Sequence, residues 1–168
     1  SFSAVVEQVR RFGPGTRMGK VDVRGAYRLL KMSRGSHKYL GFKFDGHYYV
    51  DLCLVNGAKS PCSTFEKFGK FLCKCIQAQS DDGQAVFSYL DDFFFCQRSP
   101  SNHAGELEPL DKFVKLCHYL RIPLADEKTC GPTTRIVFLG LEIDSDEMLI
   151  RVSLDKLAAA ANKLRHFI

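Results

Sequence analysis

The sequence contains no apolar run close to the roughly 20 residues that a membrane-spanning helix needs. Its first residues also lack the basic start, apolar stretch and cleavage site of a secretory signal peptide. Neither sign of charge is in large excess, because 24 Lys and Arg side chains stand against 19 Asp and Glu, for a net charge of +5. These absences predict an intracellular protein, cytoplasmic or nuclear, with no membrane partner. The mild positive charge permits a polyanionic partner without requiring one.

The sequence also lacks the cysteine patterns of zinc sites and disulfide frameworks. Its seven cysteines are odd in number, no pair has Cys-x-x-Cys spacing, and the five histidines are scattered. We therefore expect reduced cysteines that act as small apolar core residues.

What is present is an ordinary globular composition, 45% apolar and 26% charged over 168 residues, which predicts one domain with a core. An Asp45-Gly46 turn between two aromatic-rich segments predicts a hairpin. Helices alternate with strand pairs, so we predict an α+β fold with an antiparallel sheet and helices packed on one face. The expected helices are 3–12, from Ser60-Pro61 onward, 110–120 and from Ser153 onward; the expected strands are 20–27, 39–44, 47–54, 85–89, 92–96, 135–143 and 148–152.

Three carboxylates stand out because they interrupt apolar strands. Asp91 and Asp92 are adjacent at a predicted tight hairpin, and Asp22 lies between two valines. At ~4 Å and an effective dielectric near 20, two like charges repel by about 4 kcal/mol. If neighbouring strands bring Asp22 beside Asp91, the three carboxylates form the ligand set of a two-metal site, which predicts two Mg²⁺ or Mn²⁺ ions. The alternatives are that Asp91 and Asp92 are ordinary turn residues and that Asp22 faces solvent on an edge strand.

Five segments, in order, resemble the palm motifs of reverse transcriptases, and together they span about residue 18 to residue 157. Three shorter stretches, 40–44, 63–68 and 127–132, are most similar to DIRS-like retrotransposons, which carry a tyrosine recombinase. The five segments are Asp22-Val-Arg-Gly-Ala-Tyr27, 56–66, Tyr89-Leu-Asp-Asp92, 122–129 and 138–144.

The resemblance implies an RNA-directed DNA polymerase with a polymerase palm, a ferredoxin-like core. Asp22 and Asp91 would bind both metal ions and Asp92 would support them. Lys128 would donate a proton to the leaving pyrophosphate or screen its charge; otherwise it is a surface lysine. Tyr27 would exclude a ribose 2′-hydroxyl; otherwise it is a core aromatic. The resemblance also implies substrate contacts at Val23, Tyr27, Asn56, Gly57, Lys59 and Tyr89, with Val23 a further metal ligand, and a primer grip at Phe138, Leu139 and Gly140.

We expect 1–168 to be a single palm domain, with 1–19 a remnant of the fingers or an entry helix and 153–168 a terminal helix. Fingers and thumb would be largely absent. The expected partners are an RNA or DNA template-primer and deoxynucleotides. We also expect self-association, or contact with missing fingers and thumb segments, through surplus phenylalanines. The surplus phenylalanines are Phe71, Phe93, Phe94, Phe95 and Phe113.

Two alternative functions stay open. One is a non-catalytic, domesticated palm that binds nucleic acid or self-assembles, and the other is another two-metal palm enzyme such as a nucleotide cyclase.

Overall fold

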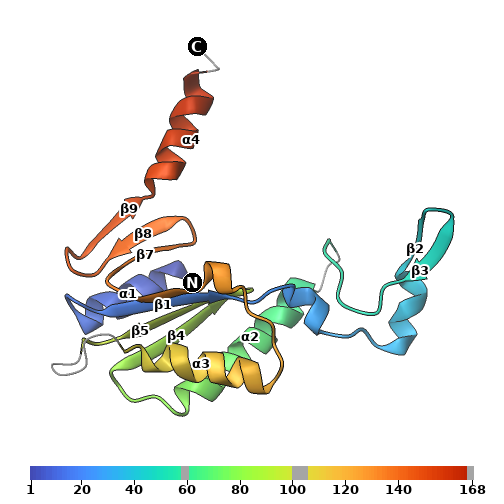
Figure 1. Cartoon of the computed structure of the whole chain (residues 1–168), viewed down its shortest axis with the longest axis horizontal. Helices are drawn as coiled ribbons and strands as arrows, with labels where there is room; N and C mark the ends of the chain where they lie inside the picture. The colour runs from blue at the N-terminus through green and yellow to red at the C-terminus, as the bar shows by residue number, and fades with distance from the viewer. Residues whose placement is uncertain (58–60, 100–105, 166–168) are drawn as a thin grey trace.

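A four-stranded antiparallel sheet forms the centre of the computed structural model, which describes residues 1–57, 61–99 and 106–165 (Figure 1). The strand order is β4-β5-β1-β6. The last strand was not predicted, because glycine and proline disfavour strands in general. Here glycine is required: a Cβ on Gly131 would lie 2.6 Å from the Gly19 Cα. The strands are β1 (Arg17–Asp22), β4 (Gln84–Tyr89), β5 (Asp92–Gln97) and β6 (Cys130–Thr133).

Two long helices, α2 (Pro61–Gln77) and α3 (Glu108–Tyr119), cover one face of this sheet (Figure 1). Successive strand residues point to opposite faces. Phe93 and Phe95 therefore both point toward the helices, where their rings lie 4.5 and 5.1 Å from that of Phe113. This arrangement confirms the predicted α+β class.

The opposite face of the sheet is also covered, and this second core was not anticipated. Phe94 points to this side, and its ring lies 5.0 Å from that of Phe138. The expectation of surplus exposed phenylalanines is therefore wrong for Phe93, Phe94, Phe95 and Phe113, which are fully buried, whereas Phe71 is 56% exposed. The covering elements are α1 (Phe2–Phe12), β7 (Arg135–Phe138), β8 (Leu141–Asp144) and β9 (Leu149–Val152).

Several predicted strands are shorter in the structure. Those predicted over 39–44 and 47–54 are reduced to Gly41–Phe44 and His47–Val50, and left-handed residues lie at or beyond the ends of two others. The strand predicted over 135–143 turns at Leu139 and Gly140, with φ of 48° and 81°, so three strands replace the predicted pair. The strand predicted over 20–27 ends at Asp22. Gly25, at φ 61°, then begins the 3₁₀ turn η1 (Ala26–Leu29).

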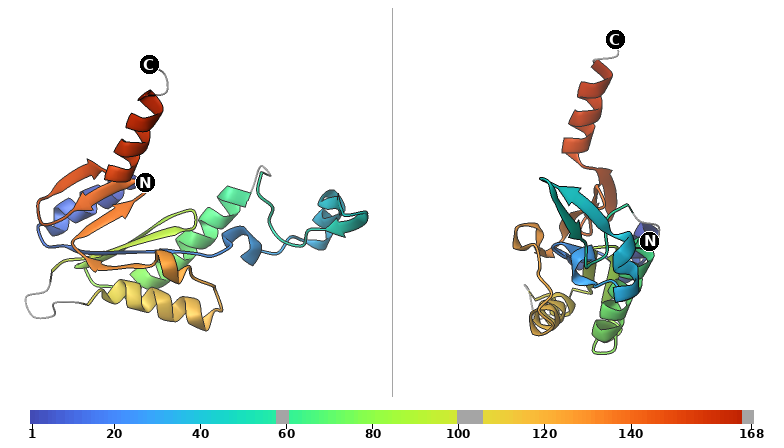
Figure 2. Two further views of the ribbon diagram at one scale, coloured as in Figure 1. Left: turned by 45° about the horizontal axis from the view of Figure 1, so that its top comes forward. Right: turned by 90° about the vertical axis from the view of Figure 1, so that its right-hand side faces the viewer.

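An arm leads from this turn to a hairpin that stands away from the sheet (Figures 1 and 2). Asp45 and Gly46 form its turn with φ of 46° and 76°, which confirms the predicted hairpin. Helix α4 (Leu154–Arg165) projects from the end of β9. The arm contains η2 (Arg34–Tyr39), β2 (Gly41–Phe44) and β3 (His47–Val50), and η3 (Asp126–Lys128) precedes β6.

All seven cysteines lie in the described residues and are free thiols. Cys73, Cys96 and Cys117 are buried, as expected of core residues, and burial raises the pKa of the Cys96 and Cys117 thiols to about 12. Cys62 and Cys130 are exposed instead. Among the helices that the structure describes, none has the length and apolar character to cross a membrane.

Candidate active site

The register of the sheet brings the three singled-out carboxylates to one end of neighbouring strands. Asp22, the last residue of β1, lies directly opposite Asp92, the first residue of β5. The N–H of Val23 donates to the Asp91 carbonyl oxygen at 2.9 Å. The sequence-based expectation had paired Asp22 with Asp91; the register instead pairs it with Asp92, because Asp91 belongs to the turn between β4 and β5.

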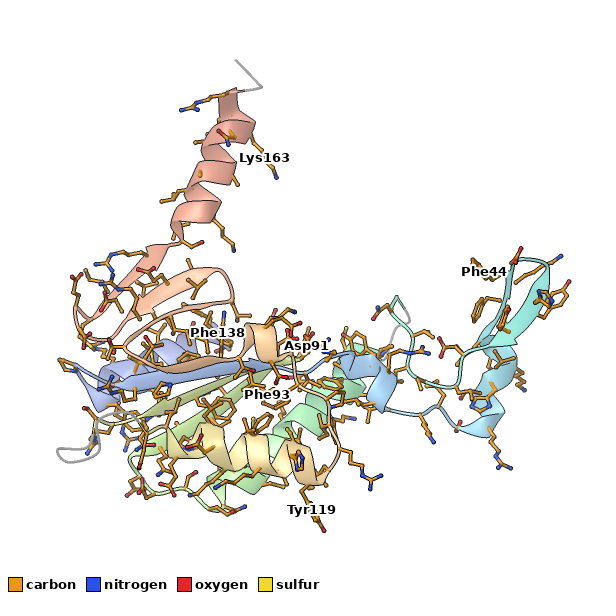
Figure 3. All side chains as sticks on the ribbon, in the orientation of Figure 1. Phe44, Asp91, Phe93, Tyr119, Phe138 and Lys163 are labelled. Carbon is orange, nitrogen blue, oxygen red and sulfur yellow. The ribbon has the colours of Figure 1, made fainter. Side chains whose placement is uncertain are left out.

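The backbone of that turn is strained at Leu90. Leu90 has φ of 54°, a left-handed value that side-chain-bearing residues adopt at a cost. Tyr89 precedes it, lies opposite Asp92 and is half exposed. Apolar packing of β5 on both faces fixes the strand and therefore the position of the turn. Figure 3 shows Asp91 at the end of the sheet from which the arm departs.

The electrostatics of the site reflect the crowding of like charges. Burial, followed by the charges of Asp91 and Asp22, raises the pKa of the Asp92 carboxyl above its usual value. One nearby cation compensates Asp22: the Lys128 ammonium donates to its Oδ2 at 3.0 Å. This hydrogen bond and the charge of Asp22 raise the pKa of Lys128. The carboxylates are therefore only partly neutralised by the protein itself.

We expect Asp92→Asn to stabilise the metal-free protein at neutral pH. A carboxyl whose pKa is raised on folding binds its proton more tightly in the folded state, so ionised Asp92 disfavours folding. The penalty is absent below the unfolded pKa near 3.8 and complete above the raised folded pKa. Thermal melts in EDTA should therefore show a higher midpoint for the variant at pH 7, with the difference vanishing below about pH 4.

Asp82→Asn is the matched control, because Asp82 also belongs to an Asp-Asp pair near a strand end but is exposed. It should leave the midpoint nearly unchanged at both pH values. A lower midpoint for Asp92→Asn at pH 7 would show that the Asp92 carboxylate is well compensated and would contradict this electrostatic description.

Two hollows flank the carboxylates. One, of about 470 Å³, is lined by Asp22, Asp92 and Lys128 together with residues of β6 and β7. The other, of about 410 Å³, is lined by Asp91, Tyr27 and residues of the arm. The carboxylates therefore lie at the boundary between two spaces, each large enough for part of a ligand. The second hollow also contains Asn56, and the remaining lining residues are Gly25, Ala26, Arg28, Asp51, Leu54 and Val55.

Tyr27 is held firmly at the wall of the second hollow. Its ring meets Phe65 edge-on, with centroids 6.0 Å apart and planes at 87°. Its hydroxyl lies 3.0 Å from the Cys62 Sγ. That hydrogen bond, together with burial and the charges of Cys62 and Asp91, raises the pKa of Tyr27 to about 12. Tyr27 is thus both a partner of the core and a wall of the hollow, so the two sequence-based alternatives are compatible.

An ion pair in the second hollow was missed by sequence reasoning. Arg28 Nη1 donates to both carboxylate oxygens of Asp51, and the pair fixes the base of the arm. Arg28 and Asp51 are 23 residues apart, and the fold of the arm alone brings them together. No local motif in the sequence signals such a contact.

The other sequence-predicted residues have varied positions. Gly57 has φ of 86° with open space where a Cβ would be, so its backbone conformation favours glycine. Lys59 lies outside the described residues. Phe138 is buried against Phe94, and Leu139 and Gly140 form the turn that follows, so the predicted primer grip stays a prediction for the β7–β8 turn.

The donor set suits Mg²⁺, which prefers carboxylate oxygens. Within the residues that the structure describes, however, no three His, Cys, Asp or Glu side chains are already gathered closely enough to hold a metal ion. The three aspartates are neighbours by register, and their side chains open toward different hollows. Binding a cation would require Asp22, Asp91 and Asp92 to turn toward one another, and the charge of the cation would offset their mutual repulsion.

Comparison with solved structures shows a shared fold. Foamy viral protease-reverse transcriptase in complex with dsDNA matches 83% of this chain and 27% of its own length, with a TM-score of 0.69 and 19% identity. The same enzyme in complex with an RNA/DNA hybrid gives a TM-score of 0.68 and 19% identity over 83% of this chain and 17% of its own. A Prototype Foamy Virus protease-reverse transcriptase mutant gives 0.62 and 17%, over 82% of this chain and 16% of its own.

This chain therefore has a reverse-transcriptase-like fold and spans about a quarter or less of the length of those structures. No protein-family model and no curated protein matches its sequence.

Proposed function

We propose that this chain is the palm of an RNA-directed DNA polymerase from a retroelement, with the DIRS-like group the most similar. The single observation that carries the proposal is the register that sets Asp22 opposite Asp92 and hydrogen-bonds Val23 to Asp91. The shared fold with the foamy viral enzymes supports it. The reaction would add deoxynucleotides to a primer 3′-hydroxyl on an RNA or DNA template.

In this proposal Asp22 and Asp91 hold two Mg²⁺ or Mn²⁺ ions, Asp92 supports them, and the backbone at Val23 supplies a further ligand. The bound ions would neutralise the charge that develops on the attacking and leaving oxygens. The protein's own contribution is positioning: strained Leu90 presents Asp91, and the sheet register aligns Asp22 with Asp92. Placing the reacting groups correctly accounts for much of the catalysis in phosphoryl transfer.

The two hollows suggest where the substrates lie. The hollow with Tyr27 and Asn56 would take the incoming nucleotide, and the hollow with Lys128 would take the primer end. Lys128 contacts Asp22 and does not line the nucleotide hollow. We therefore assign Lys128 the neutralisation of Asp22 in place of proton donation to pyrophosphate.

Single-nucleotide addition to a labelled primer tests this proposal. With primer annealed to an RNA template, addition should require Mg²⁺ or Mn²⁺ and stop when EDTA is added. The Lys128–Asp22 ion pair and the absence of a preformed ligand group in the described residues favour the second candidate, a non-catalytic nucleic-acid-binding module. Tight primer–template binding without any metal-dependent addition would favour that module and contradict the polymerase proposal.

We expect Tyr27→Ala to relax sugar selection. Removing the ring from the wall of the nucleotide hollow opens space where a 2′-hydroxyl would lie, and steric selection of this size is worth about 10–200-fold. The ratio of ribonucleotide to deoxynucleotide addition should rise by that order. Tyr27→Phe is the matched control, because it loses the Cys62 contact and keeps the ring. Equal selectivity for Tyr27→Ala and the unaltered protein would leave Tyr27 a core aromatic only.

A further inference from the structure

One face of the β2–β3 hairpin consists entirely of aromatic rings. Residues directly opposite one another in an antiparallel pair share a face. The register pairs Phe42 with Tyr49 and Phe44 with His47. The Phe42 and Tyr49 rings are stacked, with centroids 5.5 Å apart and planes 21° from parallel, and the His47 ring lies 6.5 Å from that of Tyr49. All four side chains are exposed, and Phe44 is 70% exposed.

Positive charge lies elsewhere on the same arm: Lys38 belongs to η2, and the register pairs Lys43 with Tyr48 on the other face of the hairpin. The ammonium groups of Lys38 and Lys43 lie 4.9 and 5.4 Å from the ring centroids of Tyr39 and Tyr48, which are themselves 77% and 83% exposed. The arm therefore combines open rings with cations, and Lys43 projects from the face opposite Phe42, Phe44, His47 and Tyr49. The charged side chains of segment 31–50 are Lys31, Arg34, Lys38 and Lys43, against the single carboxylate Asp45.

The hairpin receives little support from the rest of the protein. All eight residues of β2 and β3 are exposed, and the hairpin stands at the end of the arm, away from the sheet (Figures 1 and 2). A two-stranded hairpin by itself is only marginally stable in water. Clustered exposed apolar side chains usually mark a contact surface. These features indicate that the aromatic face is covered by a partner when the protein acts.

The chemistry of the surface favours single-stranded nucleic acid as that partner. Unpaired bases stack on aromatic rings, and neighbouring cations attract the phosphates between them. A second copy of the chain would instead bring another cationic hairpin against the first, and the like charges would repel. We propose that the face formed by Phe42, Phe44, His47 and Tyr49 binds single-stranded nucleic acid by base stacking. This goes beyond the proposed catalysis, because neither the carboxylates nor a metal takes part.

Fluorescence anisotropy with a short labelled oligothymidylate tests the proposal on the full chain. Phe44→Leu keeps an apolar side chain but removes the ring, and should weaken binding about tenfold. Phe44→Trp should bind at least as tightly as the unaltered protein. Tyr119→Ala is the matched control: Tyr119 is 83% exposed on α3, far from Phe44 in Figure 3, and its removal should change nothing.

Salt dependence supplies a second readout. Affinity should fall as salt rises, with a slope of log K against log salt of about −0.7 for each phosphate contact of a single strand. A nuclear Overhauser effect between the Phe42 and Tyr49 rings reports whether each variant keeps the hairpin. Binding of the oligonucleotide should be the same with and without EDTA, so this test is independent of catalysis.

Three results would overturn the proposal. Equal affinity of Phe44→Leu and the unaltered protein would show that stacking plays no part. Equal loss of binding in Tyr119→Ala would show that exposed aromatics contribute without a defined site. If light scattering shows that the unaltered protein is a dimer and that Phe44→Leu is a monomer, the face binds a second copy of the chain instead.

Discussion

Asp91→Asn should lower the rate of metal-dependent nucleotide addition by about a thousandfold. A metal ion stabilises transition-state charge by several kcal/mol, and each 1.36 kcal/mol is a factor of ten in rate. Asp91 borders the hollow that contains Tyr27, and its backbone carbonyl accepts from Val23, so an amide at this position keeps the turn and removes one negative charge. Steady-state addition of one deoxynucleotide to a labelled primer measures the effect.

Asp82→Asn provides the control for that experiment. Asp82 is exposed and is also one of two adjacent aspartates, but it precedes the first residue of β4, so the substitution makes the same chemical change outside the site. Its rate should equal that of the unaltered protein. Full activity of Asp91→Asn would show that Asp91 holds no essential metal ion, and would remove the basis of the proposed mechanism.

Phe94→Ala should reduce the free energy of unfolding by about 3–5 kcal/mol, the usual cost of removing a buried phenylalanine ring. Phe94 is fully buried on the face of the sheet that α1 and β7–β9 cover, with its ring 5.0 Å from that of Phe138. The same substitution therefore tests whether the second core stabilises the fold. Urea denaturation followed by circular dichroism measures the change.

Phe71→Ala is the matched control, because Phe71 is 56% exposed on α2. A surface substitution of this kind usually changes stability by no more than about 0.5 kcal/mol. Similar losses for Phe71→Ala and Phe94→Ala would mean that the second face of the sheet is not packed as described. The contrast also separates a core phenylalanine from a surface phenylalanine.

Much of the fold could be predicted because its signals are local. The apolar stripe of α2, the Asp45-Gly46 turn and the adjacent strands around Asp91-Asp92 each depend on neighbouring residues, and the structure contains all three. Strand β6 was not predicted because its Gly131 is needed where the backbone comes close to Gly19, and a contact between segments so distant in sequence leaves no local signal. The second core escaped for the same reason, since α1 and Phe138 are far apart in the sequence.

In the candidate site too, the sequence identifies individual residues but not the contacts between distant ones. Asp22, Asp91 and Asp92 could be chosen from the sequence because charges inside apolar strands are costly. Their pairing could not, because a shift of one residue in register changes which aspartate lies opposite Asp22. The Arg28–Asp51 ion pair depends on how the arm folds back, and no short motif encodes that geometry.

Paramagnetic relaxation by Mn²⁺ shows directly whether Asp22, Asp91 and Asp92 converge on divalent cations. With one equivalent of Mn²⁺ added to isotope-labelled protein, the amide signals of Asp22, Val23, Asp91 and Asp92 should broaden first. Asp91→Asn should weaken this broadening, whereas Asp82→Asn should leave it unchanged. Broadening centred on another acidic segment such as Asp81-Asp82, or none at the end of β1 and β5, would contradict the account.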